Sequence, residues 1–241
     1  GSPTVQSNAL LVLGDLCVKY TNMVDRYLPV MAACMQSGIT DINNNVLAGP
    51  ASNGSALVRK HAVLLLSSLL LQEYLKWRGL LFQRFLVASA DEDEDVARLA
   101  ELVLCGPLIT KQPKLFFNQF VESIFVLNRC TAHPVYQAAA SLGDGGSGIS
   151  VGFDGINLTG EVGRVRRLSM YQMMLSKMTD EEKIGVTARL TKEILGGALE
   201  GGSDLNMVCI SSSDSSSPGS RPTAKYESAL NVLSDAFTVL S

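Results

Sequence analysis

The fold is decided by residues 55–90, which read SALVRKHAVLLLSSLLLQEYLKWRGLLFQRFLVASA. Apolar side chains recur in this stretch at steps of three and four residues, the spacing that places them on one side of an α-helix. Ser55 precedes the run and is suited to cap its first turn. The apolar stripe of this first predicted helix consists of Val58, Ala62, Leu65, Leu66, Leu69 and Leu70.

A second helix is predicted over residues 76–90, with charged side chains between its apolar positions. The two helices would form a hairpin whose apolar surface needs cover on two sides. The continuous apolar core, residues 62–71, contains two serines and is flanked by charges. A membrane-spanning helix needs roughly twenty apolar residues, so we expect no membrane span here. The apolar positions of the second helix are Leu80, Leu81, Phe85 and Leu86.

The composition is that of a chain able to build a sizeable core. It has 241 residues, of which 46% are hydrophobic, and a net charge of -3. This balance does not by itself indicate binding to nucleic acid or membranes. No two cysteines lie two to four residues apart, so the spacing of a zinc site is absent. We expect buried free thiols at Cys17, Cys34, Cys105, Cys130 and Cys209.

A Val-x-x-x-Ala signature recurs at the start of three predicted helices. It occurs at Val5–Ala9, Val58–Ala62 and Val96–Ala100, with offsets of 53 and 38 residues. The second offset is close to the roughly 40–47 residues of HEAT-type helix pairs. The first is lengthened by residues 37–54, which are rich in turn-forming residues and are predicted to be an inserted loop.

Each of these first helices is followed by a second one, at 22–36, 76–90 and 113–129. The short alanine allows paired helices to approach closely, and stacking would bury stripes that no single pair can cover. We therefore predict an all-α fold, a HEAT-type α-solenoid of stacked antiparallel helix pairs. Residues 1–134 would hold three such pairs, with the insertion at 37–54.

The second half of the chain is less regular. Residues 135–163 are predicted to hold a short helix, which starts near His133, and a glycine-rich loop. Residues 164–199 are predicted to form a further helix pair. Residues 200–222 are predicted to be a serine-rich linker. Thr179 or Asp180 is expected to cap the second helix of that pair. A C-terminal helix is predicted over 223–241. Its expected apolar stripe is Tyr226, Leu230, Leu233, Phe237 and Leu240.

Nothing in the sequence indicates catalysis, a cofactor or a metal. His61 and His133 are the two histidines, and we expect them to be solvated or satisfied side chains. The segment GDGGSG lacks the lysine and the serine or threonine of a phosphate-binding loop.

The acidic run Asp91–Asp95 could hold a cation. Adjacent carboxylates do not converge as calcium ligands do, and negative charge favours a helix N-terminus, so capping is preferred.

Arg164, Arg166 and Arg167 form a basic group ahead of Ser169. They are a possible phosphate or partner contact, or simply the solvated start of a helix. The pattern Arg-Arg-x-Ser is one that kinases accept, so Ser169 is a possible phosphorylation site. Trp77, the single tryptophan, is either a packing residue or a binding hot spot.

Four segments resemble the D-type HEAT subunits of condensin II, towards their C-terminal side. The resemblance implies a non-enzymatic scaffold that supports mitotic chromosome condensation in the nucleus, on the chromosome. Its implied partners are the kleisin and SMC ATPase subunits and, through the assembled complex, chromatin. DNA binding by this chain alone is expected to be weak. The alternative is a peptide- or cargo-binding helical solenoid adaptor in transport. The segments are NALLVLGDLCVKYTNMVDRYLP (8–29), VRKHAVLLLSSLLLQEYLKWRGLLFQRFL (58–86), GPLITKQPKLFFNQFVESIFVLNRCTAHP (106–134) and MTDEEKIGVTARLTKEILGGAL (178–199).

Overall fold

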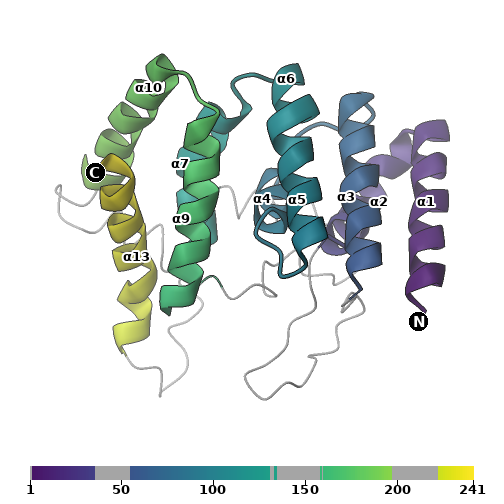
Figure 1. The fold of residues 1–241 in the computed structure, drawn as a ribbon, viewed down its shortest axis with the longest axis horizontal. Helices are drawn as coiled ribbons and strands as arrows, with labels where there is room; N and C mark the ends of the chain where they lie inside the picture. Colours follow the sequence, from purple (N-terminus) through teal and green to yellow (C-terminus); the bar gives the residue numbers. More distant parts are fainter. Residues whose placement is uncertain (1, 36–54, 131–132, 135–157, 159, 197–221) are drawn as a thin grey trace. The chain divides into compact units, whose positions relative to one another are not determined.

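The computed structural model describes residues 2–35, 55–130, 133–134, 158, 160–196 and 222–241 (Figure 1). These residues form helices and connections and contain no β-strand, which confirms the all-α prediction. Within the same ranges no helix has both the length and the apolar content needed to cross a membrane. The predicted insertion at 37–54, most of the short helix after His133, the loop at 143–157, the linker at 200–221 and Cys209 lie outside the described residues.

The chain divides into two compact units, with the boundary between Pro113 and Lys114. The predicted third helix pair therefore has one helix in each unit. The helices of the first unit are α1 (Pro3–Lys19), α2 (Asn22–Ala33), α3 (Ala56–Leu71), α4 (Leu81–Ala88), α5 (Glu94–Val103), the π-helical turn η1 (Leu104–Leu108) and α6 (Ile109–Lys111). Those of the second are α7 (Leu115–Leu127), α9 (Gly160–Ser176), α10 (Asp180–Leu190), the π-helical turn η2 (Thr191–Gly196) and α13 (Pro222–Leu240).

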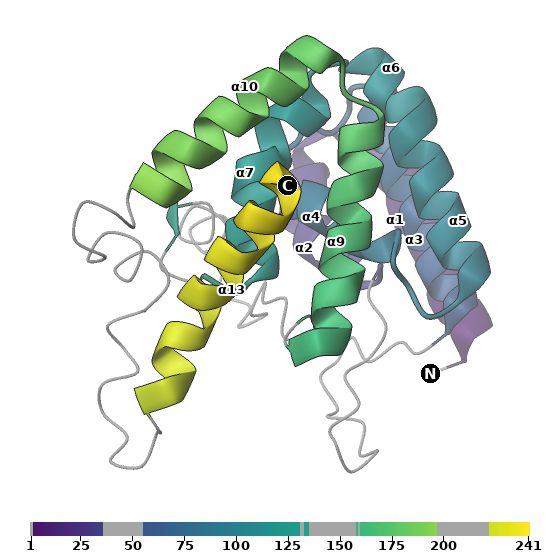
Figure 2. The same cartoon turned by 60° about the vertical axis from the view of Figure 1, so that its left-hand side comes forward.

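The first unit is built on a row of three helices. Helix α3 packs between α1 and α5, as Figures 1 and 2 show, while α2 contacts α1 and α3, and α4 contacts α5. The row consists of the first helices of the three predicted pairs. Its core is the α3 stripe predicted from the sequence, in which Leu66 is fully buried.

The repeat signature is buried in two of its three copies. Val58, Ala62, Val96 and Ala100 are fully buried, whereas Val5 is 66% exposed. In α1 the buried positions are instead Ser7, Leu10, Gly14 and Cys17.

Gly14 takes the role expected of the alanine in α1. A Cβ atom added at Gly14 would lie 2.2 Å from Cδ1 of Leu65, so α1 and α3 approach closely at this point. The signature therefore located the first helix of the row but not the face that it buries.

Helix α4 is shorter and more buried than predicted. It covers only Leu81–Ala88, and all eight residues are buried, including Gln83 and Arg84. The Arg84 Nη1 atom donates to the carbonyl oxygen of Ala32 at 3.3 Å. Arg84 was expected among the charges between the apolar stripes, but it is an interior residue that bridges α4 to the end of α2.

The acidic run caps α5 and also ties it to α3. The Asp93 side chain accepts a hydrogen bond from the Val96 N–H at 3.1 Å, which confirms the N-cap. Asp91 instead lies 2.8 Å from Arg59, and these two side chains are only 4% and 5% exposed. Asp95 pairs with Lys60 at 2.7 Å on the surface. The prediction that the run only caps a helix is therefore wrong for Asp91.

In the second unit, α9 begins four residues ahead of the predicted start at Arg164. Helix α10 begins with a capping box in which Thr179 and Glu182 each bond the other's backbone N–H, as the sequence suggested for Thr179. The helical chain then continues through η2 as far as Gly196.

Helix α13 presents a different face to its neighbours than predicted. Its buried positions are Ala229, Val232, Asp235 and Ala236. Two members of the predicted stripe, Leu230 and Phe237, are instead 63% and 59% exposed. Helix α13 packs against α7 and α9, and Asp235 on its buried face meets the partners described below.

The cysteine prediction holds in part. Cys17 and Cys34 are buried thiols, as expected. Cys130 takes part in a disulfide, so the expectation of a free thiol is wrong at this position.

Candidate functional site

The structure does not gather the three predicted arginines on one surface. Arg164 and Arg166 are half-buried on α9, while Arg167 is 1% exposed. The Arg167 guanidinium forms a two-bonded pair with Asp235, with Nε to Oδ2 at 2.7 Å and Nη2 to Oδ1 at 3.1 Å. It also donates to the carbonyl oxygen of Leu158. Arg167 is therefore an interior residue here, and its assignment to a surface phosphate contact is corrected.

Asp235 is the centre of a buried polar network in the second unit. Its Oδ2 atom also accepts from the Asn128 amide at 2.8 Å and from the Tyr171 hydroxyl at 3.2 Å. Burial and the Asp235 charge hold the pKa of Tyr171 well above its usual value. The network joins α7, α9 and α13, and every charged member has a partner, the condition for burying charge at acceptable cost. Its role is to position α13.

Ser169 is exposed, but it lies in the middle of α9. Arg166 and Arg167 of the Arg-Arg-x-Ser pattern are on the same helix, and the second of them is engaged by Asp235. The pattern is therefore present in sequence but is not displayed as an extended segment.

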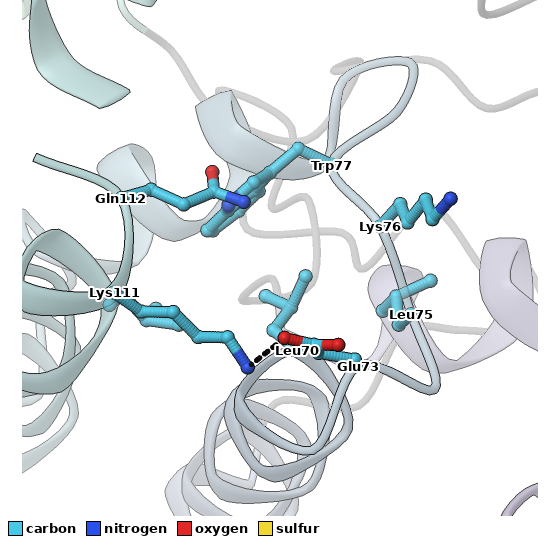
Figure 3. A pocket seen from close by; sticks show the side chains of 8 residues that line it. Leu70, Glu73, Leu75, Lys76, Trp77, Lys111 and Gln112 are labelled. Carbon is cyan, nitrogen blue, oxygen red and sulfur yellow. Dashed lines mark ion pairs between the residues drawn. The ribbon is translucent and has the colours of Figure 1, made fainter. Parts of the chain in front are cut away.

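A pocket of about 310 Å³ opens in the first unit where α3 ends (Figure 3). It is lined by the end of α3, by the connection to α4, and by the segment η1–α6. Its apolar residues are buried, apart from Trp77, which is half-buried. We refer to it as the Trp77 pocket; its lining residues are Leu70, Glu73, Leu75, Lys76, Trp77, Leu108, Lys111 and Gln112.

Trp77 is held in place by edge contacts with two phenylalanines. Its ring centroid lies 5.9 Å from that of Phe82 and 5.7 Å from that of Phe85, with both interplanar angles at 74°. T-shaped contacts of this kind fix the orientation of a ring. Trp77 thus packs on α4 and also lines the pocket, which supports the packing interpretation; the binding interpretation stays a prediction.

Trp77 forms one wall of the pocket. A second wall is formed by the ion pair between Lys111 and Glu73, whose charged atoms are 3.0 Å apart. The Lys111 ammonium also donates to the carbonyl oxygen of Leu71 at the end of α3, where a cation is favoured. Glu73 has a φ of 64°, in the left-handed region that side chains other than glycine and asparagine rarely adopt. In Figure 3 the lysine extends across the lower rim toward Glu73.

The third wall follows from a break in helical regularity. Pro107 lies inside the five-residue π-helical turn η1, where its missing N–H and its ring are incompatible with α-helical hydrogen bonding. Leu108, the last residue of this turn, lines the pocket together with Lys111 and Gln112, which follow it. Figure 3 shows Lys111 and Gln112 on the side of the pocket opposite Leu75 and Lys76. The chain thus departs from regular helix on both sides of the pocket.

Neither histidine lines the pocket. His61 Nδ1 is hydrogen-bonded to the Ser7 hydroxyl. The His133 ring stacks on Phe125, with centroids 4.7 Å apart, and burial lowers its pKa. Within the described ranges, no group of three or more His, Cys, Asp or Glu side chains is arranged to hold a metal ion.

The helices packed in a row define an all-α protein. A family model described as non-SMC mitotic condensation complex subunit 1 matches residues 4–141, more than half of the chain. The chain belongs to this family. No solved structure matches it.

Among curated proteins the chain is similar to D3-type subunits of condensin-2 complexes. It is 31% identical to condensin-2 complex subunit D3 of Mus musculus and 32% identical to condensin-2 complex subunit CAP-D3 of Arabidopsis thaliana. It is 28% identical to condensin-2 complex subunit D3-L of Xenopus laevis. Each match covers 82% of the chain but only 12–14% of the relative. The resemblance inferred from the four sequence segments is thereby confirmed.

The sequence drew attention to Trp77 but not to the pocket around it. The pocket joins residues about 40 positions apart, and periodicity does not show which side chains meet over that distance. One signal was available: Gly106-Pro107 inside a helical pattern indicates a local break.

Proposed function

We propose that the chain is a non-catalytic scaffold segment of a condensin II subunit. In this proposal it supports mitotic chromosome condensation, in the nucleus and on the chromosome, by contacting the kleisin, the SMC ATPase heads and chromatin. The observation that carries the proposal is the similarity to condensin-2 D3 subunits over 82% of the chain. The description of the matched family as a non-SMC subunit supports a role apart from the ATPases.

The fold supports a scaffold role in a second way. The row α1–α3–α5 buries its stripes between successive helices, and such stacking leaves a long surface for partners. The proposed contacts with phosphate are weak and involve Arg164 and Arg166 on α9. Ser169 remains the proposed phosphorylation site, with the local opening of α9 as its requirement.

The test is co-purification of the tagged chain with the condensin II kleisin and SMC subunits from mitotic cells. We expect the chain to recover these subunits, and a variant with a destabilised core, Leu66→Asp, to lose them. Clean separation under mild salt, when the full-length subunit is tested in parallel, would contradict the proposal. Recovery of cargo receptors without condensin would instead favour the transport adaptor.

A further inference from the structure

We propose that the Trp77 pocket is a docking site for an extended peptide. The peptide inserts one large apolar side chain beside Trp77 and places an acidic residue next to Lys76. This goes beyond the proposed function, because it concerns a ligand recognised by its chemistry, whichever complex supplies it.

The size and lining of the pocket fit a single side chain. Its volume of about 310 Å³ is at the small end of ligand pockets, which span roughly 300–1,000 Å³. Leu70, Leu75 and Leu108 are at most 5% exposed and form the apolar wall, while Trp77 is half-buried. A half-buried tryptophan beside buried leucines is typical of a binding site, because an apolar group of the ligand can cover the part of the ring that is still exposed.

Two departures from regular backbone meet at this pocket. Glu73 is held at a φ of 64°, and η1 is a π-helical turn containing Pro107. Strained residues and π-helical turns concentrate at functional sites, because their cost is retained only where it is useful. Glu73 follows the C-cap of α3, where a left-handed residue ends many helices, so the π-helical turn is the departure that supports a binding role.

The charged side chains at the rim of the pocket favour a peptide that carries an acidic residue. Lys111 is already engaged by Glu73 and by the Leu71 carbonyl. Lys76 is exposed and forms no ion pair with any residue that the structure describes. In Figure 3 Lys111 extends inward to Glu73, whereas Lys76 lies on the opposite side of the pocket and its side chain extends outward from the rim. The positive charge available to a ligand is therefore that of Lys76, which an aspartate or glutamate complements.

The backbone next to the pocket favours a peptide over a small molecule. The connection from Gln72 to Leu80 is not helical. Within the described ranges, the N–H groups of Lys76 and Trp77 donate to no backbone carbonyl. Donors in an irregular segment can pair with the carbonyls of an extended peptide, as in other modes of peptide recognition.

The fluorescence of Trp77 can report peptide binding directly, because Trp77 is the single tryptophan in the chain. The experiment titrates the 241-residue chain with the blocked peptide Gly-Ser-Asp-Leu-Asp-Ser-Gly and follows Trp77 fluorescence. Two further peptides replace the leucine with alanine or both aspartates with lysine. We expect saturable binding of the first peptide. Loss of the leucine side chain should weaken binding at least about ten-fold, the effect of losing one buried apolar group.

Two variants test the charge assignment. Lys76→Glu should weaken the acidic peptide about two- to five-fold at low salt and favour the lysine peptide, as expected for an exposed charge pair. Glu73→Gly suits the left-handed backbone and releases Lys111, so it should tighten binding of the acidic peptide. Lys177→Glu, which changes an exposed charge just past the end of α9, is the matched control and should change nothing.

The proposal is overturned by any of three results. These are the absence of a saturable Trp77 signal with the leucine peptides, equal binding of the alanine peptide, and an unchanged order of peptide affinities in Lys76→Glu. Circular dichroism melting of each variant establishes that it is folded before binding is compared. Because Glu73→Gly relieves strain, it keeps the test decisive even if another variant is unstable.

Discussion

Arg59 and Asp91 show how a single residue departs from its apparent sequence role. Asp91 is one of five consecutive acids, yet its side chain is buried against Arg59 at 2.8 Å. Removing one partner of a buried ion pair leaves an uncompensated charge, which costs about 3–5 kcal/mol. We therefore expect Asp91→Ala to lower the free energy of unfolding by about that amount, measured by urea denaturation. Asp95→Ala, which removes an exposed carboxylate of the same run, is the control and should have a much smaller effect.

Leu66 provides a direct test of the core. It is fully buried on α3, whereas Leu64 on the same helix is 46% exposed. Leu66→Ala should lower the free energy of unfolding by about 2–5 kcal/mol, through lost transfer energy and the cavity left behind. Leu64→Ala should change it by no more than about 0.5 kcal/mol. Equal denaturation midpoints for the two variants would contradict the placement of α3.

His133 should make stability depend on pH. Burial lowers its pKa from the ordinary 6.5, against an opposing effect of Glu193, so the unfolded chain binds its proton first as the pH falls. The neutral ring thus contributes stability that is present above pH 6.5 and is lost as the pH falls toward the lowered pKa. His133→Phe, which keeps the stacking on Phe125, should lose less stability than the parent between pH 7.5 and 5.5. Thermal melts across this range measure the difference, and parallel pH curves would refute it.

At the scale of the element, α13 is positioned by polar rather than apolar contacts. Arg167→Leu and Asp235→Ala should each cost about 3–5 kcal/mol, since each leaves the other charge buried without its partner. Replacing both by apolar residues should cost less than the sum of the single changes. Hydrogen exchange of α13 should rise in Asp235→Ala more than that of α10. Additive single effects would show that the pair does not act as a unit.

The same helices show which features of the fold could be predicted from the sequence and which could not. The start of α10 followed from Thr179, and the body of α3 from its apolar period, because local chemistry determines both. The face of α13 could not be predicted, because its contacts depend on two alanines and an aspartate whose partners lie more than 60 positions away. Arg167 was misplaced for the same reason: its side chain is charged, but its environment is set by Asp235.

At the scale of the whole molecule, the structure reduces the charge available to DNA. Arg167 is buried, and Lys183 pairs with Asp180 at 3.1 Å on α10. Arg164 and Arg166 remain as the proposed phosphate contacts in a chain of net charge -3. Affinity that does not depend on DNA sequence comes from cations that release counterions, so we expect weak duplex binding by this chain.

The measurement is a salt titration of fluorescent duplex binding. With two phosphate contacts, the logarithm of the binding constant should fall with a slope of about -2 against the logarithm of salt concentration. At physiological salt the dissociation constant should be weaker than micromolar, within the non-specific range of about 10⁻⁴–10⁻⁶ M. Arg164→Glu with Arg166→Glu should abolish the residual binding, whereas Arg98→Glu, an exposed charge on α5, is the matched control. Submicromolar binding that survives the double change would place the DNA contact elsewhere on the chain. If binding is weak in the parent, is lost in the double variant and is kept in Arg98→Glu, the proposal holds. Tight DNA binding by the proposed condensin complex would then come from its other parts.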